Sequence, residues 1–181
     1  MADLFTHVLV AYALGTALSV RYVWVTPQLV TVAMMGALIP DLSRGSLLVP
    51  DETVTATFGV PFDWFGFHTV GGVLVASLVG VILVRPTQRR RVLLLLLLGG
   101  GSHLFLDALL LKPSGYAAPI LWPLANQGPP TPGLYHSTDR WPAVVAAVSA
   151  AVTWYGRYQC RRQRSNVSYS RSRCSGVSRE M

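Results

Sequence analysis

Charged residues are scarce in this chain of 181 residues, because Asp, Glu, Lys and Arg together make up only 13% of it. A soluble domain usually carries about twice that fraction. Hydrophobic residues account for 51%, and they cluster in stretches such as 73–84 and 92–98 that contain almost no polar side chain. A helix that is apolar on every face is buried in protein or in lipid. A chain this short cannot bury several such helices in one soluble core, so its composition predicts a polytopic membrane protein.

Cysteine is nearly absent as well, since the chain has only Cys160 and Cys174, both close to its C-terminal end. Their position excludes a disulfide framework and a thiolate metal site. No Lys or Arg precedes Arg21, so the N-terminal region lacks the basic segment of a standard signal peptide. The range 157–181 holds seven Arg and many Ser without an apolar period, which predicts a disordered tail. Such a tail beside a membrane favours anionic lipid as a partner, and we do not expect nucleic acid.

Five apolar segments are predicted to form transmembrane helices, which gives an all-α bundle over residues 1–156 followed by the tail 157–181. Crossing ~30 Å of hydrocarbon takes ~20 residues, a length that the third and fourth segments approach. An arrangement of four spans, with a re-entrant first or second helix, is the alternative. The ranges 41–66 and 112–140 are rich in Pro, Gly and aromatic residues and are predicted to be ordered loops. The five segments are Leu4–Val20, Pro27–Pro40, Phe67–Val84, Val92–Leu111 and Trp141–Tyr155.

The distribution of charge predicts the orientation of this bundle. With five spans, twelve of the fifteen basic residues share one side, and seven of the eight acidic residues share the other. The positive-inside rule assigns the basic side to the cytoplasm. We therefore expect a multi-pass protein of the plasma membrane with its N-terminus outside and its C-terminus inside. The glycines at 99–101 are expected to let neighbouring helices approach closely.

The histidines all fall on the predicted outer side or in the outer half of the bundle. Asp107 follows His103 by four residues, so the two side chains share one helix face. His103 lies roughly 16 Å from the inner end of its segment, and ionisable groups at such a depth are costly and mark functional sites. The candidate site residues are His7, Asp41, Asp63, His68, His103, Asp107 and His136.

Imidazole and carboxylate groups are ligands of Zn²⁺, Mn²⁺ or Fe²⁺, and a divalent ion would compensate the charge of Asp107. An ion with an open position supports metal-assisted hydrolysis at the outer membrane–water boundary. Each residue also has a simpler interpretation. His103 and Asp107 can form a hydrogen-bonded pair without metal, and His7 can be an interfacial anchor. Asp41 and Asp63 can be helix-end or cap residues, and His136 can be a surface histidine.

Short motifs in a fixed order connect these residues to a known family. They are Thr6-His7, the Gly36–Leu42 segment with Pro40-Asp41-Leu42, Phe67-His68-Thr69, the Gly101–Asp107 segment with Ser102-His103, and Trp122-Pro123-Leu124. Over about residues 1–155 this pattern resembles the membrane-bound metal-dependent hydrolase family, which includes the LexA-binding inner-membrane-associated hydrolases. It is most similar to the haloarchaeal branch of that family.

The resemblance implies a helical membrane protein with a divalent-metal site and hydrolase activity. It implies His7, Asp41, His68, His103 and Asp107 as ligands, and phosphoester substrates by similarity to zinc-dependent phospholipase C and nuclease folds. The sequence departs from the family pattern in two places. Ser43 stands where many members have a second acid, and the segment before His68 lacks their His-Arg-Gly element. Either Asp63 replaces the missing His, or this branch keeps the fold without the activity.

Three functions are consistent with these residues. The first is a membrane-embedded hydrolase that holds zinc, or else manganese or iron, and acts on a phospholipid or other phosphoester, with Asp63 or His136 as the proton carrier. The second is a non-catalytic scaffold with a buried polar network and a basic interaction tail. The third is a metal transporter, which the lack of an internal repeat disfavours.

Overall fold

The structure, a computed structural model, describes residues 3–122 and 124–177, with side chains up to residue 163. Within these residues it is built from helices and contains no β-strand, only two isolated β-bridges in a loop. The predicted all-helical class is therefore confirmed. The α-helices are α1 (Leu4–Arg21), α2 (Pro27–Leu38), α3 (Asp51–Phe58), α4 (Val70–Ile82), α5 (Arg89–Ala108) and α6 (Trp141–Val177), and the 3-10 helices are η1 (Pro40–Leu47), η2 (Trp64–His68) and η3 (Pro86–Gln88).

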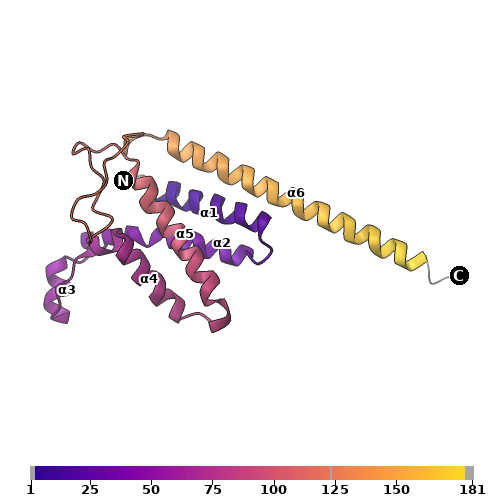
Figure 1. The fold of residues 1–181 in the computed structure, drawn as a ribbon, viewed down its shortest axis with the longest axis horizontal. Coiled ribbons are helices and arrows are strands. Elements are labelled where there is room, and N and C mark those ends of the chain that lie inside the picture. The colour runs from indigo at the N-terminus through magenta and orange to yellow at the C-terminus, as the bar shows by residue number, and fades with distance from the viewer. Residues whose placement is uncertain (1–2, 123, 178–181) are drawn as a thin grey trace.

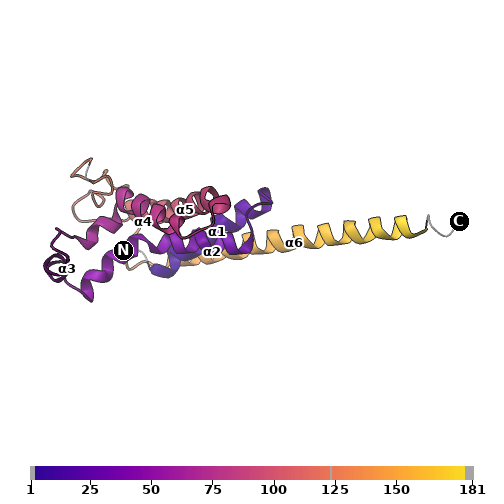
Figure 2. The ribbon, with the colours of Figure 1, turned by 90° about the horizontal axis from the view of Figure 1, so that it is seen from below.

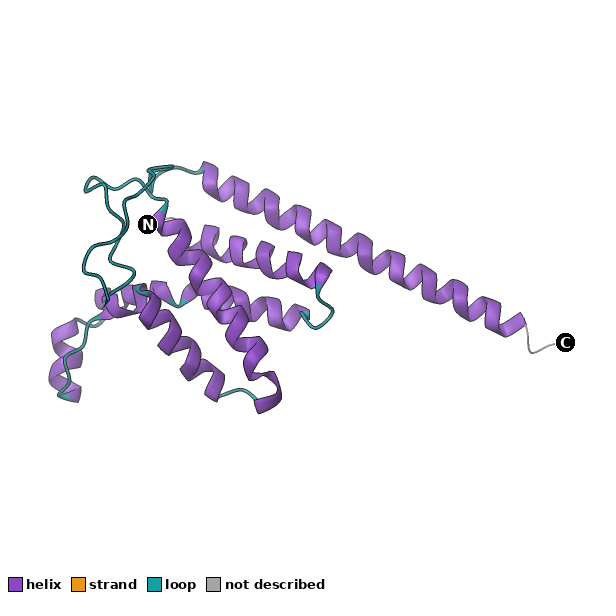
Figure 3. Ribbon diagram, in the orientation of Figure 1, coloured by secondary structure: helices purple, strands orange, loops and turns teal. Residues whose placement is uncertain are grey.

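The long helices form a bundle in which neighbours contact one another in the order α6, α1, α2, α5, α4. Long helices that follow one another along the chain run in opposite directions, whereas the neighbours α1 and α6 run in the same direction, and α6 extends well past the rest of the bundle (Figures 1 and 2). The loops that join the long helices lie at two opposite ends of the bundle (Figure 3). We call one the histidine end, formed by the start of α1, η1, η2 and the last turns of α5. The other is the arginine end, formed by Arg21, the segment 85–91 and Arg157.

Glycine allows α2 and α5 to pack with their backbones almost in contact. A Cβ atom added at Gly36 would overlap the backbone of Leu96, and one at Gly99 would overlap the carbonyl oxygen of Ala33. Gly101, by contrast, faces open space. The close approach expected for the 99–101 segment is therefore confirmed at Gly99, whereas Gly101 takes no part in it.

The outward faces of the helices are apolar. Val75 and Ile82 on α4 are 61% and 69% exposed, and Val148 and Val152 on α6 are 57% and 64% exposed. Two segments, α1 and the range Pro86–Ala108, are long and apolar enough to cross a membrane, and α2 and α4 are shorter apolar helices. Two candidate spans are thus present in the described chain. The five-span count and the N-out orientation stay predictions.

Two helix boundaries differ from the sequence prediction, one because a side chain caps the helix and the other because the helix extends further along the chain. The segment predicted from Phe67 is split, because residues 64–68 form η2 and the Thr69 side chain accepts a hydrogen bond from Gly72 N at the start of α4. The backbone of α6 continues to Val177, through a range for which the sequence predicts disorder. Arg and Gln are good helix formers, and extending a helix is easier than starting one. The domain boundary at residue 156 stays a prediction.

The 41–66 range was predicted as an ordered loop, but much of it is helical. It holds η1, α3 and the start of η2. Asp51 and Glu52 lie in the first turn of α3, where carboxylates suit the helix dipole. Gly59 ends the helix with a left-handed φ of 69°, a conformation that favours glycine.

Candidate metal centre at the histidine end

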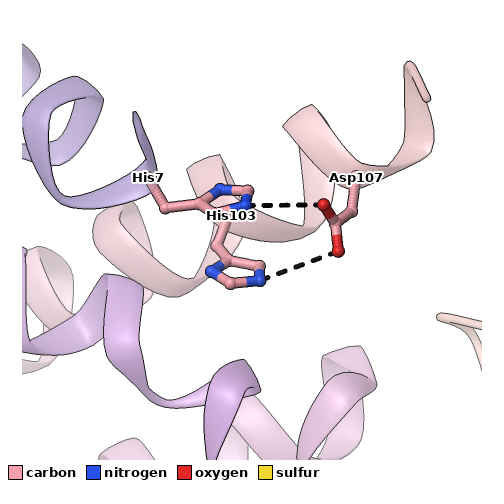
Figure 4. Close-up of side chains that lie close together, drawn as sticks. All are labelled: His7, His103 and Asp107. Carbon is pink, nitrogen blue, oxygen red and sulfur yellow. Dashed lines mark ion pairs between the residues drawn. The ribbon is translucent and has the colours of Figure 1, made fainter. Parts of the chain in front are cut away.

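Four of the predicted site residues come together inside the histidine end. His7 comes from α1, His68 from the last residue of η2, and His103 and Asp107 from consecutive turns of α5. All four are buried, with exposed fractions between 0% and 5%. Figure 4 shows the imidazoles of His7 and His103 on one side of the Asp107 carboxylate. The i, i+4 spacing seen in the sequence therefore places His103 and Asp107 on one face, as expected.

The carboxylate of Asp107 is the centre of this cluster. Its Oδ2 atom lies 3.1 Å from His68 Nε2 and 3.8 Å from His103 Nε2, and its Oδ1 atom lies 3.4 Å from His7 Nε2. One ligand atom from each of His7, His103 and Asp107 lies within 4.8 Å of the others. The buried His7, His103 and Asp107 group could therefore hold a metal ion.

Backbone carbonyls orient two of the imidazoles. The Nδ1 atom of His103 lies 2.7 Å from the carbonyl oxygen of Ala37, and Nδ1 of His68 lies 3.4 Å from that of Pro40. A carbonyl oxygen only accepts hydrogen bonds, so each Nδ1 carries the proton and donates it. In a neutral imidazole the opposite nitrogen, Nε2, then presents a lone pair. Metal-binding histidines are held in this way, with the second nitrogen bonded to a carbonyl.

Local packing explains why the two carbonyls lie where they do. The close approach of α2 and α5 at Gly36 and Gly99 brings the end of α2, with Ala37, against His103. His68 is fixed by its neighbour Thr69, whose hydroxyl donates to Gly66 O at 2.7 Å and accepts from Gly72 N at 3.0 Å. These backbone contacts cannot be predicted from residue types, because every residue has a carbonyl group.

Several buried polar atoms in the cluster have no hydrogen-bond partner among the described residues. They are Nδ1 and Nε2 of His7, Nε2 of His103, and Oδ1 of Asp107. Buried polar groups are almost always paired, because an unpaired one costs about 1–3 kcal/mol. They belong to the three residues whose ligand atoms lie within 4.8 Å of one another, an arrangement that fits a cation.

Asp41 lies at the edge of the cluster rather than in its centre. Its Oδ1 atom pairs with Arg44 Nε at 3.0 Å, and the Asp41 side chain is 8% exposed. Burial raises the pKa of the Asp41 carboxyl and the nearby charge of Asp107 adds to this, while Arg44, His7 and His68 act in the opposite direction. Asp41 thus pairs with Arg44 rather than with a histidine of the cluster.

The two predicted proton carriers lie on the surface. Asp63 is exposed, and its carboxylate accepts a hydrogen bond from Phe65 N at 2.7 Å as the cap of η2. His136 is exposed in the loop before α6, where its backbone N donates to Asp139 Oδ2 at 2.8 Å. Their catalytic role stays a prediction.

Tyr135 is a residue of this region that the sequence analysis missed. It is 5% exposed, and its hydroxyl donates to the carbonyl oxygen of Leu106 at 2.7 Å. Burial and the charge of Asp107 raise the pKa of the Tyr135 hydroxyl to about 12. The only signal in the sequence was its place beside His136, and the structure buries the tyrosine of this pair and exposes the histidine.

The motifs that carried the family resemblance contribute most of this site, although Pro123 of the Trp122-Pro123-Leu124 segment lies outside the described residues. No curated protein and no solved structure matches the chain. One family model, described as YdjM inner membrane protein, matches residues 1–170. This match agrees with the apolar helices α1 and α5 and with the predicted membrane location. The chain therefore belongs to the YdjM inner membrane protein family and is a protein of the inner (plasma) membrane.

Proposed function

We propose that this protein is a membrane-embedded, metal-dependent hydrolase whose ion is held by His7, His68, His103 and Asp107. The observation that supports the proposal is the convergence of three imidazole Nε2 atoms on one buried carboxylate, at 3.1–3.8 Å. Asp41, at the edge of the cluster, is the proposed fifth ligand or the acid that orients the others.

Protonation of both His7 and His103 to imidazolium satisfies this cluster poorly. Each Nε2 that faces the carboxylate needs either a proton or a cation between the two lone pairs. The rings of His7 and His103 are stacked, with centroids 3.7 Å apart and planes at 14°. Two imidazolium cations in that position would repel each other strongly in a buried site. One divalent ion, in contrast, pairs with the nitrogens and the carboxylate at once.

A site of imidazole nitrogens and a carboxylate suits zinc best, with manganese or iron as alternatives. Such an ion, when bound, supplies Lewis-acid chemistry, because it polarises a phosphoryl or carbonyl oxygen and makes water more acidic. The chain's own residues orient the ligands through Ala37 O and exclude bulk water by burial. These features support hydrolysis of an ester that reaches the histidine end from the membrane.

The surroundings of the site favour an anionic ester. The side chain of Arg44 is 43% exposed and pairs with Asp41, so a partly exposed cation lies at the edge of the cluster. Arginine binds phosphate oxygens in a fork geometry. We therefore propose a phospholipid or other phosphoester as the substrate class. Asp63 and His136, exposed at the same end of the bundle, are the proposed proton carriers.

The proposed topology has five spans, with the histidine end outside and the arginine end in the cytoplasm. Twelve of the fifteen basic residues would then lie on the cytoplasmic side, which supports this orientation under the positive-inside rule. The substrate would then enter from the outer leaflet. In this arrangement α2 and α4 cross with the help of η1, η2 and the loop segments at their ends.

A non-catalytic scaffold is the competing proposal, because the ion-pair distances around Asp107 also suit an imidazolium–carboxylate network. Metal analysis separates the two. Protein purified in detergent without chelator is expected to hold about one zinc, manganese or iron per chain, and His103→Ala and His68→Ala are expected to lose it. The matched control is His136→Ala, because this histidine is exposed in a loop, and it should keep the metal.

Folding must be checked in the same samples by size-exclusion chromatography and helical circular dichroism. A folded wild-type protein that takes up none of the three ions would reject the metal site. If metal binds, hydrolysis of a chromogenic phosphodiester is the second measurement. Activity that is removed by chelator and restored by the ion supports the hydrolase, whereas a metal-loaded protein without activity on phosphodiesters or phospholipids favours the scaffold.

A further inference from the structure

A second polar site lies at the opposite end of the bundle, where α6 passes the turn between α1 and α2. It is a cavity of about 170 Å³ lined by side chains that include Ser19, Thr26, Arg157 and Arg161. The two arginines are one turn apart on α6, and both line the cavity. No acidic residue is among those that line it.

The positive charges of Arg157 and Arg161 have no acidic residue of the cavity lining to balance them, so an anion from outside the chain would fit there. Like charges at i and i+4 repel each other, and a carboxylate nearby would normally compensate them. In the described chain every acidic residue lies outside the segments that form the arginine end. These residues are Asp3, Asp41, Asp51, Glu52, Asp63, Asp107 and Asp139.

The start of α2 adds a smaller contribution to the same cavity. Thr26 caps this helix and Pro27 occupies its first turn, and both line the cavity with Arg157 and Arg161. The N-terminal end of a helix carries a partial positive charge. The cavity thus combines two full positive charges with a helix end of the same sign.

Aromatic residues place the cavity at the membrane surface. Trp154, Tyr155 and Tyr158 of α6 are 56%, 57% and 50% exposed, within one turn of Arg157. Exposed Trp and Tyr gather where the hydrocarbon meets the lipid headgroups. From Trp141, α6 rises roughly 24 Å to Arg157 and roughly 30 Å to Arg161, about the thickness of the hydrocarbon layer.

We infer that Arg157 and Arg161 form a binding site for the phosphate of one anionic phospholipid. Arginine pairs with phosphate oxygens in a two-pronged geometry, and the acyl chains would lie along the apolar face of α6 that ends at the exposed aromatics. The chemistry recognised is a phosphate monoanion, and the level of the cavity favours a lipid headgroup over free phosphate. The site is separate from the proposed metal centre and does not depend on it.

The test counts lipids bound to the full-length protein in detergent by native mass spectrometry, where no membrane surface potential contributes. Phosphatidylglycerol is expected to bind in a ratio of about one per chain and more tightly than phosphatidylcholine. The double variant Arg157→Gln/Arg161→Gln should bind it about 100-fold more weakly, since one hydrogen bond between charged groups contributes about tenfold or more. The control Arg85→Gln/Arg90→Gln removes the same charge from exposed positions at the same end, outside the cavity, and should bind nearly as wild type.

Each outcome decides the proposal. Equal loss in both double variants would mean diffuse attraction rather than a site, and unchanged binding in Arg157→Gln/Arg161→Gln would overturn it as well. Inorganic phosphate is the third probe. Displacement of the lipid by millimolar phosphate would assign the cavity to a soluble anion and overturn the lipid assignment, whereas persistence of the lipid supports it. Retained circular dichroism in the glutamine variants shows that weaker binding does not come from unfolding.

Discussion

Gly99 connects the packing of the bundle to the geometry of the proposed metal centre, so Gly99→Ala tests both. A Cβ at this position would overlap Ala33 O and crowd Ala37 N, which are backbone atoms of α2 that cannot rotate away. The helices must separate, and the carbonyl of Ala37 then moves away from His103 Nδ1, which it contacts at 2.7 Å. We therefore expect Gly99→Ala to lower both the stability and the metal content.

The size of the effect follows from a comparison with Gly101→Ala. Both substitutions replace a helical glycine and gain about 1 kcal/mol of helix propensity, but only Gly101 faces open space. Forcing a methyl group into a filled interface costs about 1–3 kcal/mol. For a chain of this size 1 kcal/mol corresponds to about 2–4 °C in Tm, so Gly99→Ala should melt roughly 2–12 °C below Gly101→Ala.

The measurement is thermal unfolding in detergent by circular dichroism, together with metal analysis of the same preparations. Gly101→Ala should unfold at or above the temperature of the wild-type protein and keep its metal. The reasoning fails if the two alanine variants melt together. It also fails for the metal centre if Gly99→Ala melts early yet retains a full complement of metal, because the contact between Ala37 and His103 would then not matter for the ligand.

Two further predictions concern residues around the site. The pKa of Tyr135 is raised from 10.0 to about 12, so the folded protein keeps this proton where the unfolded chain loses it. The contribution of Tyr135 to the free energy of unfolding is therefore complete below pH 10 and is lost as the pH rises toward 12. Tyr135→Phe should weaken this loss of stability when unfolding is measured across that pH range. An unchanged pH dependence would contradict the burial of the hydroxyl. Thr69→Val should lower the free energy of unfolding by about 1 kcal/mol, because it removes the side-chain acceptor for Gly72 N. The control Thr31→Val, at an exposed position, should leave it unchanged. Equal melting temperatures of the two variants would argue against the cap.

The sequence predicted the site where local spacing was enough. His103 and Asp107 needed only the helical period, and the placement of His7 and His68 at the outer ends of their segments added two residues that the structure brings to the same carboxylate. Asp41 was also predicted as a metal ligand, but it lies at the edge of the histidine cluster, where its carboxylate pairs with Arg44.

The remaining features of the site depend on tertiary contacts that cannot be predicted from the type of a residue. The carbonyls of Ala37 and Pro40 orient the histidines, yet any residue has a carbonyl. Three consecutive glycines looked equivalent in the sequence, and only the packing of α2 distinguishes Gly99 from Gly101.

In the fold, short polar segments were the harder part. Helix α3 was missed, although the acids in its first turn and the glycine after its last residue are ordinary helix signals. The break between η2 and α4 was also missed, because the apolar run continues through it and only the Thr69 cap marks the boundary.

The order of the ligands along the chain has a consequence for biogenesis. His7 enters the membrane with the first helix, but Asp107 stands at the end of α5, after α2, η1, η2 and α4. During synthesis the earlier imidazoles are therefore made before their carboxylate, which follows only with the last turns of α5. Metal capture at the proposed centre would then require the chain through Asp107, so the ion would join the first and last parts of the bundle only after α5 is in place.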